Sequence, residues 1–197
     1  GDLVLFANRG AWITALDAAT GKERWARFDW SSWIEWDGVL AEDGLYYVGS
    51  SDLRAVRALD PAPGKAKWET DVLGWAWGTP ALTSDTVFIG VAGPREYVTK
   101  HAAGLVALDR RTGAVRWRRP VAPGAAGYVS GYAGSVVVSD GVLVAPNVHG
   151  TLEGFRLQTL TPATRAVLAR ALGDPGPDQL RAFGELAEQP DWQGVVD

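Results

Sequence analysis

The sequence predicts an all-β fold of repeated four-stranded antiparallel units, and three observations lead to this prediction. An eleven-residue motif that opens with Ala-Leu-Asp and closes with Trp occurs three times in the 197-residue chain. A second segment, two apolar runs joined by a short polar turn, recurs at 39–49, 81–90 and 136–145. The chain also holds 24 Gly and 10 Trp. Since Trp is usually scarce, ten of them indicate a repeated structural role or an aromatic binding surface.

The first half of each unit is predicted to be a β-hairpin. In the second unit, a strand over Val39–Glu42 turns at Asp43-Gly44 into a strand over Leu45–Gly49. Asp-Gly between apolar runs favours a two-residue type I′ turn, because such a turn needs positive φ at both central positions. The corresponding turns are expected at Asp85-Thr86 and Asp140-Gly141.

The second half of each unit adds a third and a fourth strand. In the second unit these are Ala55–Leu59 and, after a turn over Asp60–Gly64, the strand that carries Trp68. Asp and Thr side chains bind turn amides and Gly adopts the left-handed conformation, so Asp-x-x-Thr-Gly is a turn sequence. The Trp then reaches a fixed point on the outer strand, where its ring wedges against the neighbouring unit. Four antiparallel strands in about 40–45 residues is the period of a β-propeller blade.

The three motif copies resemble those of a known family. They lie at 15–25, 58–68 and 107–117, with their Asp residues 43 and 49 positions apart. This pattern is similar to the tryptophan-docking motif, Ala-x-Asp-x-x-Thr-Gly-x-x-x-Trp, of the pyrroloquinoline-quinone-type (PQQ-like) β-propeller repeats. Pro63 replaces Thr in the second copy, which weakens the side-chain bonding of that turn but not its geometry. The resemblance covers residues 2–158 and implies the fold rather than one activity. The family includes quinoprotein dehydrogenases, the propeller lipoprotein of outer-membrane β-barrel assembly and sensor domains of receptor kinases.

The repeat predicts about four blades. Leu3–Ala7 and Trp12–Leu16 match second and third strands, and so do Val142–Pro146 and Leu152–Leu157 at the other end. There Gln158 replaces the motif Asp. We therefore expect three strands in the first blade, four in each of the next two and three in the last. Rings of this family have seven or eight blades, so we expect these blades to be part of such a ring. Further blades upstream or a second chain, as in a homodimer, would complete it.

The chain is divided into propeller blades over 1–158 and a helical C-terminal tail over 159–197. Thr161-Pro162 is a helix start and Gly173 a stop, and a second apolar stripe runs up to Pro190. Two short amphipathic helices are unstable alone, so the tail is expected to cap the last blade or to dock on another chain.

Composition excludes several partners and chemistries. The chain has 19 basic and 23 acidic residues, and the tail holds three Arg and six acidic residues. An almost neutral body with an acidic tail is unsuited to nucleic acid, and no apolar run is long enough to span a membrane. The absence of Cys excludes disulfides, Cys-ligated metals and Cys nucleophiles. His101 and His149 are too few for a histidine-rich metal site.

The candidate binding site is an aromatic mouth of the channel. Loops between a fourth strand and the next first strand carry aromatic residues, and the third unit has an insertion on the same face. The candidates for ligand or partner binding are Trp33, Trp36, Trp75, Trp77, Tyr132, Arg95, Lys100 and His101. Repeats place equivalent loops side by side, so these rings are expected to converge. The alternative is that the aromatic rings pack between blades as core.

No catalytic motif is found in the sequence. Quinoprotein dehydrogenases commonly carry a vicinal Cys pair and a calcium cage, and the sequence offers neither. We therefore expect a non-catalytic scaffold for protein–protein interaction in the periplasm or outside the cell, without cofactor or metal. The alternatives are a sensor propeller that binds a small ligand, or pyrroloquinoline quinone with calcium, and a fragment of a quinoprotein dehydrogenase.

Overall fold

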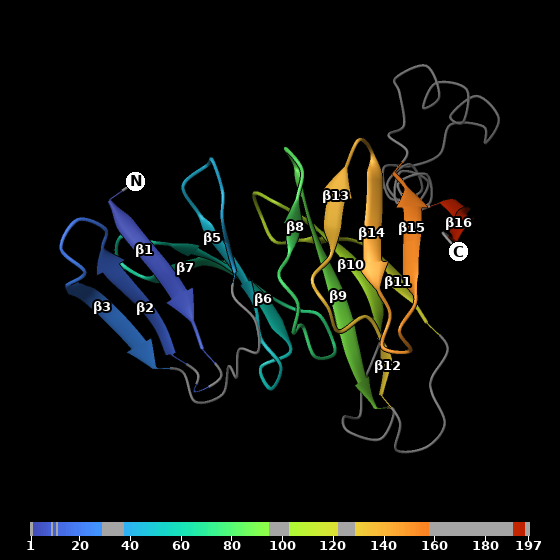
Figure 1. The fold of residues 1–197 in the computed structure, drawn as a ribbon, viewed down its shortest axis with the longest axis horizontal. Helices are drawn as coiled ribbons and strands as arrows, with labels where there is room; N and C mark the ends of the chain where they lie inside the picture. Colours follow the sequence, from blue (N-terminus) through green and yellow to red (C-terminus); the bar gives the residue numbers. More distant parts are fainter. Residues whose placement is uncertain are drawn as a thin grey trace.

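The computed structural model describes residues 2–8, 10, 12–28, 38–94, 103–121, 129–157 and 191–195. The secondary structure of these residues consists of antiparallel strands, arranged as sheets that follow one another along the long axis of the molecule (Figure 1). The predicted all-β class is confirmed for them. They include no helix, and therefore none with the length and apolar character needed to cross a membrane.

The sheets correspond to four blades, which we number from the N-terminus. Blade 1 consists of β1 (Leu3–Ala7), β2 (Trp12–Asp17) and β3 (Glu23–Phe28). Blade 2 consists of β4 (Val39–Leu40), β5 (Tyr46–Gly49), β6 (Ala55–Asp60) and β7 (Lys65–Asp71). Blade 3 consists of β8 (Ala81–Leu82), β9 (Thr86–Pro94), β10 (Gly104–Asp109) and β11 (Val115–Pro120). Blade 4 consists of β13 (Val137–Ser139), β14 (Val142–Pro146), β15 (Leu152–Arg156) and β16 (Asp191–Val195).

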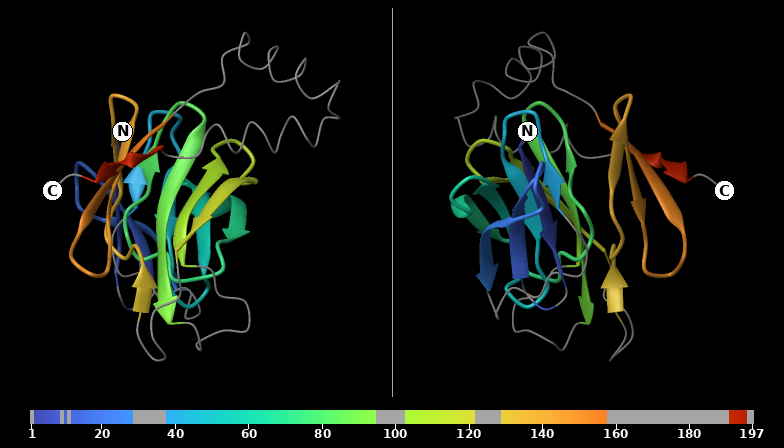
Figure 2. Two further views of the ribbon diagram at one scale, coloured as in Figure 1. Left: turned by 90° about the vertical axis from the view of Figure 1, so that its right-hand side faces the viewer. Right: turned by 60° about the vertical axis from the view of Figure 1, so that its left-hand side comes forward.

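The last strand of blade 4 comes from the tail, which corrects part of the tail prediction. β16 pairs antiparallel with β15, with Gly194 opposite Gly154, and Figure 2 shows it at the outer edge of this blade. Residues 191–195 are therefore a strand and not part of a helix. β15 would otherwise present unpaired backbone groups, which β16 satisfies. The helices predicted between Thr161 and Pro190 lie outside the described residues.

A short additional strand, β12 (Val129–Gly131), was predicted to be part of an aromatic loop. It pairs with the end of β9, where Ala92–Pro94 continue past the partner strand β10. The β9 backbone beyond Val91 thus finds a new partner instead of ending in solvent. This pairing fixes one loop of the predicted mouth onto blade 3.

The predicted type I′ turn is found in only one of the three hairpins. At Asp140-Gly141 both residues have positive φ, 50° and 74°. At Asp43-Gly44 only the Gly does, because the loop is longer: the Gly44 amide donates to the Ala41 carbonyl and the Ala41 amide to the Leu45 carbonyl. This is the pattern of a turn followed by a glycine bulge. Neither residue of Asp85-Thr86 has positive φ.

The predicted tryptophan wedge between blades is confirmed. Trp25 Nε1 of blade 1 donates to the Pro61 carbonyl of blade 2 at 2.8 Å, and Trp68 Nε1 of blade 2 donates to the Arg110 carbonyl of blade 3 at 3.0 Å. Each acceptor follows the motif Asp directly. Each ring also lies over the motif Gly of the next blade, where a side-chain carbon would come within 3.1 Å of Trp25 or 2.6 Å of Trp68.

The core lies between the blades. One cluster joins blades 1 and 2, a second joins blades 2 and 3, and a third joins blades 3 and 4. The largest fully buried side chains include Ile13, Tyr47, Leu59, Ile89, Leu105, Leu108, Tyr132, Leu143 and Phe155. Alternate residues of each strand face opposite neighbours, so every interior blade uses both of its faces for packing.

Candidate functional site

The loop that joins β7 to β8 carries two of the residues predicted for the aromatic mouth. Trp75 and Trp77 project from this loop and stack on each other, with ring centroids 4.7 Å apart and an interplanar angle of 18°. Both side chains are half-buried. The structure therefore places two of the predicted site residues together as one aromatic surface.

The loop is fixed to the blades by backbone contacts. The amides and carbonyls of Trp75 and Ala92 exchange hydrogen bonds of 2.8 and 2.9 Å, and the Ala76 amide donates to the Ser50 carbonyl at 3.1 Å. A side-chain carbon at Gly49 would overlap the Ala76 carbonyl, so this close approach requires glycine. The Thr79 amide donates to Ser135 Oγ at 3.0 Å, which ties the loop to blade 4. The two Trp rings thus stand on a rigid support.

Trp77 carries an unsatisfied donor. Its Nε1 atom is buried and has no acceptor among the described residues. A buried N–H group without a partner costs roughly 1–3 kcal/mol. The Trp75–Trp77 pair therefore offers apolar ring surface, whereas the Trp77 N–H group is enclosed by the protein.

Tyr132 is placed differently from the prediction, because its side chain is completely buried. Its hydroxyl donates to Glu153 Oε2 at 2.6 Å and its ring packs edge-on against Phe155. Burial, followed by the hydrogen bond to the Glu153 carboxylate, raises the pKa of Tyr132 well above its ordinary value. Its ring is therefore part of the packing between blades 3 and 4 and contributes no surface to the mouth.

Burial also acts on Arg119, which lies beside this tyrosine. The Arg119 guanidinium stands 4.2 Å from the centroid of the Phe155 ring. Desolvation lowers the pKa of Arg119 to about 10, although the neighbouring Tyr132 and Glu153 oppose this effect. The side chain remains a cation at neutral pH and shares the interior with the tyrosine.

The remaining predicted site residues lie outside the described residues. These are Trp33, Trp36, Arg95, Lys100 and His101. Their part in the mouth stays a prediction.

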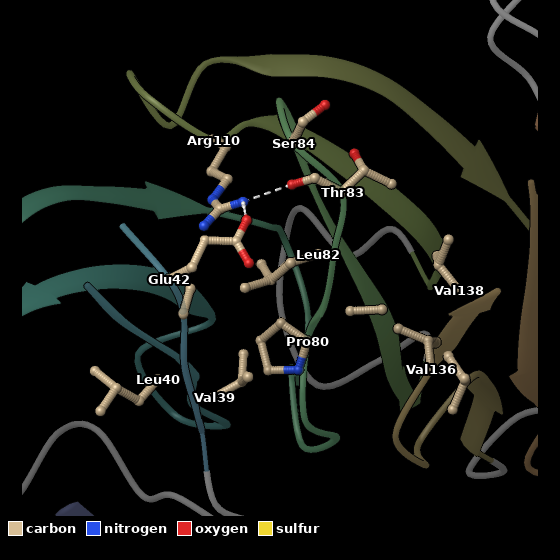
Figure 3. A pocket seen from close by; sticks show the side chains of 13 residues that line it. Val39, Leu40, Glu42, Pro80, Leu82, Thr83, Ser84, Arg110, Val136 and Val138 are labelled. Atoms are coloured by element: carbon tan, nitrogen blue, oxygen red, sulfur yellow. Dashed lines mark hydrogen bonds and ion pairs between the residues drawn. The ribbon is translucent and has the colours of Figure 1, made fainter. Parts of the chain in front are cut away.

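A cavity of about 510 Å³ along the innermost strands was missed by the sequence analysis (Figure 3). Its apolar wall comes from Val39 and Leu40 of β4, Leu82 of β8 and the valines around β13. Figure 3 shows Arg110 and Glu42 together at one end. The sequence signal that could have predicted this cavity is the apolar run before each polar turn. The runs at 39–42, 81–84 and 136–138 all line it.

Arg110 links blades 2 and 3 beside this cavity. Its Nη1 donates to the Thr83 carbonyl at 2.7 Å, and its Nε donates to Asp43 Oδ2 at 2.9 Å. Burial alone would raise the pKa of Asp43, but hydrogen bonds from Tyr47, the Leu45 amide and Arg110 outweigh it and keep that pKa below its ordinary value. The side chains form a structural ion pair between blades.

A metal site is not formed by the described residues. They contain no group of three or more His, Cys, Asp or Glu side chains that could hold an ion. The charged side chains of this part of the chain instead form ion pairs such as Arg110–Asp43 and Arg116–Asp85.

Comparison with known proteins places the repeat in one family. Residues 9–162 match the family described as outer membrane protein assembly factor BamB. The chain is 30% identical over 127 residues to outer membrane protein assembly factor BamB of Yersinia pestis, an alignment that covers 59% of this chain and 30% of that protein. It is 29% identical over 139 residues to quinohemoprotein alcohol dehydrogenase of Comamonas testosteroni, covering 61% and 18%.

Solved structures agree on the fold. BamB from Moraxella catarrhalis aligns with a TM-score of 0.59 and 23% identity, over 79% of this chain and 46% of that one. A europium-containing methanol dehydrogenase aligns with a TM-score of 0.60 and 17% identity, over 79% and 38%. The chain thus spans less than half the length of these proteins, and the similarity covers assembly factors and dehydrogenases alike.

Proposed function

Because the chain belongs to the PQQ-like β-propeller repeat family, whose members include both assembly factors and dehydrogenases, we propose that it is a non-catalytic scaffold that binds a protein partner outside the cytoplasm. The observation that carries this proposal is the stacked, partly exposed pair of Trp75 and Trp77 on a loop held by backbone hydrogen bonds. Rigid aromatic rings are frequent anchors at the centre of a protein-binding surface.

The partner surface extends over neighbouring loops of the mouth in this proposal. Trp33 and Trp36 belong to the equivalent loop of the preceding blade, and Arg95, Lys100 and His101 to the insertion after β9. The positive side chains would supply charge at the rim, where they guide association more than they strengthen it. The name of the Yersinia pestis relative concerns outer-membrane protein assembly, which supports an extracytoplasmic, periplasmic setting.

The described residues do not fit pyrroloquinoline quinone with calcium. Trp75 and Trp77 stack directly on each other at 4.7 Å, which leaves no slot between their rings for a planar cofactor. No cluster of acidic or histidine ligands occurs in the described part of the chain. We therefore take the similarity to the quinohemoprotein enzyme as a similarity of blade structure and not of cofactor binding. The scaffold remains the proposed function.

The proposal is tested by site-specific photo-crosslinking of the full chain in its host cell. A photoreactive residue at Trp77 is expected to give one discrete protein adduct, and the same residue at Leu152, an exposed position on blade 4, is expected to give none. Adding Trp75→Ala to the Trp77 crosslinking variant should remove most of the adduct, because it removes the neighbouring ring.

Three results would contradict the proposed function. The first is an absence of any adduct from position 77, and the second is the same adduct from both positions. The third is a saturable absorbance change when pyrroloquinoline quinone and calcium are titrated into the purified chain, which would favour a ligand-binding propeller.

A further inference from the structure

A small cavity of about 260 Å³ lies between blades 3 and 4, at the end of the blades that carries the turn between β8 and β9. Because neighbouring strands run antiparallel, this end is opposite to the one that carries the loop between β7 and β8. Asp85 is 61% exposed, so the cavity opens to solvent beside it. The cavity has apolar walls and a charged side, formed by Phe88, Trp117, Val138 and Leu157 and by Asp85 and Arg116.

Trp117 differs from the other two motif tryptophans in its hydrogen bonding. The Nε1 atoms of Trp25 and Trp68 donate to carbonyls of the next blade, whereas Trp117 Nε1 has no hydrogen-bond partner among the described residues. Trp117 is only 4% exposed, so its N–H group has little access to water. Unlike Trp77 Nε1, however, this atom is not completely enclosed by the protein. A ligand in the cavity can therefore pair with a donor that the protein leaves unpaired.

The junction between blades 2 and 3 shows which group fits beside such a tryptophan. Tyr47 of blade 2 and Phe88 of blade 3 are equivalent, because each pairs with the residue two before the motif Asp of its blade. The Tyr47 ring lies 5.9 Å from the ring of Trp68, and the Phe88 ring lies 5.9 Å from the ring of Trp117. The interplanar angles are 52° and 50°. The two junctions thus have the same aromatic wall.

In the junction between blades 2 and 3, this wall faces the side chain of Arg110. The guanidinium carbon lies 5.6 Å from the centroid of the Tyr47 ring, and Nε donates to Asp43 Oδ2 at 2.9 Å and to the Tyr47 hydroxyl at 3.3 Å. Figure 3 shows the guanidinium with its further hydrogen bond to the Thr83 carbonyl. The backbone carbonyl of Arg110 accepts the hydrogen bond from Trp68 Nε1. A single arginine therefore pairs with a turn aspartate, an aromatic ring and an indole N–H group.

The junction between blades 3 and 4 has these three groups but lacks the arginine. Asp85 is its turn aspartate, and the position that corresponds to Arg110 in the repeat is Thr159 in the sequence. Arg116 donates to Asp85 Oδ2 at 2.7 Å and to Asp109 Oδ2 at 3.0 Å. Two carboxylates thus share one guanidinium group, which leaves a net negative charge beside the cavity. This charge favours a cationic ligand.

We propose that this cavity binds arginine, either as the free amino acid or as a residue of a peptide. The guanidinium group lies over the Phe88 ring and donates to the Asp85 carboxylate, as Arg110 does at the neighbouring junction. The carbonyl or carboxylate group of the ligand accepts the hydrogen bond from Trp117 Nε1. Lysine has the same charge but lacks the planar group that matches a ring and a carboxylate, so the site discriminates against it.

The proposal is tested by nuclear magnetic resonance on the isotope-labelled full chain. N-acetyl-arginine amide, which represents an arginine residue within a peptide, and free arginine are titrated separately. The indole N–H signal of Trp117, assigned by its loss in Trp117→Phe, is expected to move downfield and to saturate, because the group gains a hydrogen bond. N-acetyl-lysine amide should bind more weakly by roughly tenfold.

The two arginine ligands identify the source of the ligand. Tighter binding of N-acetyl-arginine amide supports the proposal with a peptide as the natural ligand. Tighter binding of free arginine supports it with the amino acid as the ligand.

Matched variants test the groups that are expected to hold the guanidinium. Asp85→Asn should weaken the binding of N-acetyl-arginine amide by roughly fivefold, because it removes an exposed carboxylate. Asp52→Asn is the control, since it removes the same charge from an exposed residue on the loop between β5 and β6, and it should leave binding unchanged. Phe88→Tyr should strengthen binding, because it supplies the hydroxyl group that Tyr47 offers to Arg110.

Four results would overturn the proposal. The first is the absence of a saturable change in the Trp117 signal with either arginine ligand, and the second is equal binding of the lysine and arginine compounds. The third is binding that Asp85→Asn leaves unchanged. The fourth is weaker binding by Phe88→Tyr, which would place an apolar group of the ligand on the ring instead of the guanidinium. All four concern the junction between blades 3 and 4, so they leave the crosslinking test at position 77 independent.

Discussion

The junction between blades 1 and 2 and the junction between blades 2 and 3 use the same docking motif but are closed to different degrees. Trp68 is only 9% exposed and belongs to a cluster of eleven buried residues. Trp25 is half-buried, and among the described residues the cluster at its junction has four buried members. The hydrogen bonds of the two indole groups are nearly equal, at 2.8 and 3.0 Å. The motif thus sets the geometry of the junction, and the surrounding residues set its strength.

One residue of the receiving turn differs between the two junctions. The residue after the motif Asp is Pro61 at the first junction and Arg110 at the second. Both offer a backbone carbonyl to the incoming indole. Only Arg110 has a side chain that reaches back to the preceding blade, where it binds Asp43 and lies over the ring of Tyr47. The second junction therefore has a polar layer beside its apolar core.

The largest expected effect is the loss of the buried ring. Trp68→Ala should lower the free energy of unfolding by about 3–5 kcal/mol, because it leaves a cavity between two blades and an unpaired Arg110 carbonyl. Trp25→Ala should cost less, about 1–2 kcal/mol, because its ring keeps part of its surface in solvent. Urea denaturation of both variants measures the contrast. Equal losses would show that the two junctions are equally strong despite their different burial.

Much of this arrangement could be predicted from the sequence because its determinants are local. The spacing between the motif Asp, Gly and Trp fixes the turn, the strand and the docked ring within eleven residues, and these predictions are confirmed at Trp25 and Trp68. Pro63 in place of Thr also has the predicted result: Asp60 keeps the hydrogen bond from the Ala62 amide, and Gly64 keeps its φ of 66°.

Features that depend on distant residues could not be predicted in this way. β16 is recruited by the free edge of β15, and no pattern near Asp191–Val195 specifies that partner. Tyr132 lies in a loop whose sequence resembles a binding loop, yet it is buried because Gly90 on another strand admits its backbone. Trp75 and Trp77 were correctly placed on a loop, whereas their mutual stacking required the structure.

A smaller effect is expected from the polar layer of the second junction. Arg110→Met should lower the free energy of unfolding by about 1–3 kcal/mol, because it keeps much of the side-chain volume but leaves Asp43 without its cation. The loss is moderated because Asp43 is partly exposed. Arg111→Met is the matched control on the same turn, since Arg111 is exposed, and it should change stability by less than about 0.5 kcal/mol. Equal stability of the two variants would assign no net stabilisation to the ion pair.

The smallest expected effect concerns the two receiving turns themselves and depends on pH. Burial would raise the pKa of Asp109, but hydrogen bonds from Arg116 and Thr112 outweigh it and lower that pKa to about 2. A carboxyl group whose pKa is lower in the folded state stabilises the protein above its unfolded pKa, so this contribution is complete above about pH 4 and disappears as the pH falls through about 2.

Asp109→Asn should therefore lower the free energy of unfolding by roughly 1–2 kcal/mol at pH 6, a range reduced for solvent screening of a side chain that is 28% exposed. The difference from the parent chain should shrink towards pH 2, where the parent carboxyl group is itself protonated. Asp60→Asn is the counterpart at the first junction, where Pro63 supplies no hydroxyl group and a smaller loss is expected. Denaturation of both variants across this pH range measures the contrast. If Asp109→Asn lowers the free energy of unfolding by the same amount at every pH, the charge of Asp109 does not contribute. The effect would then come from hydrogen bonds that do not depend on ionisation.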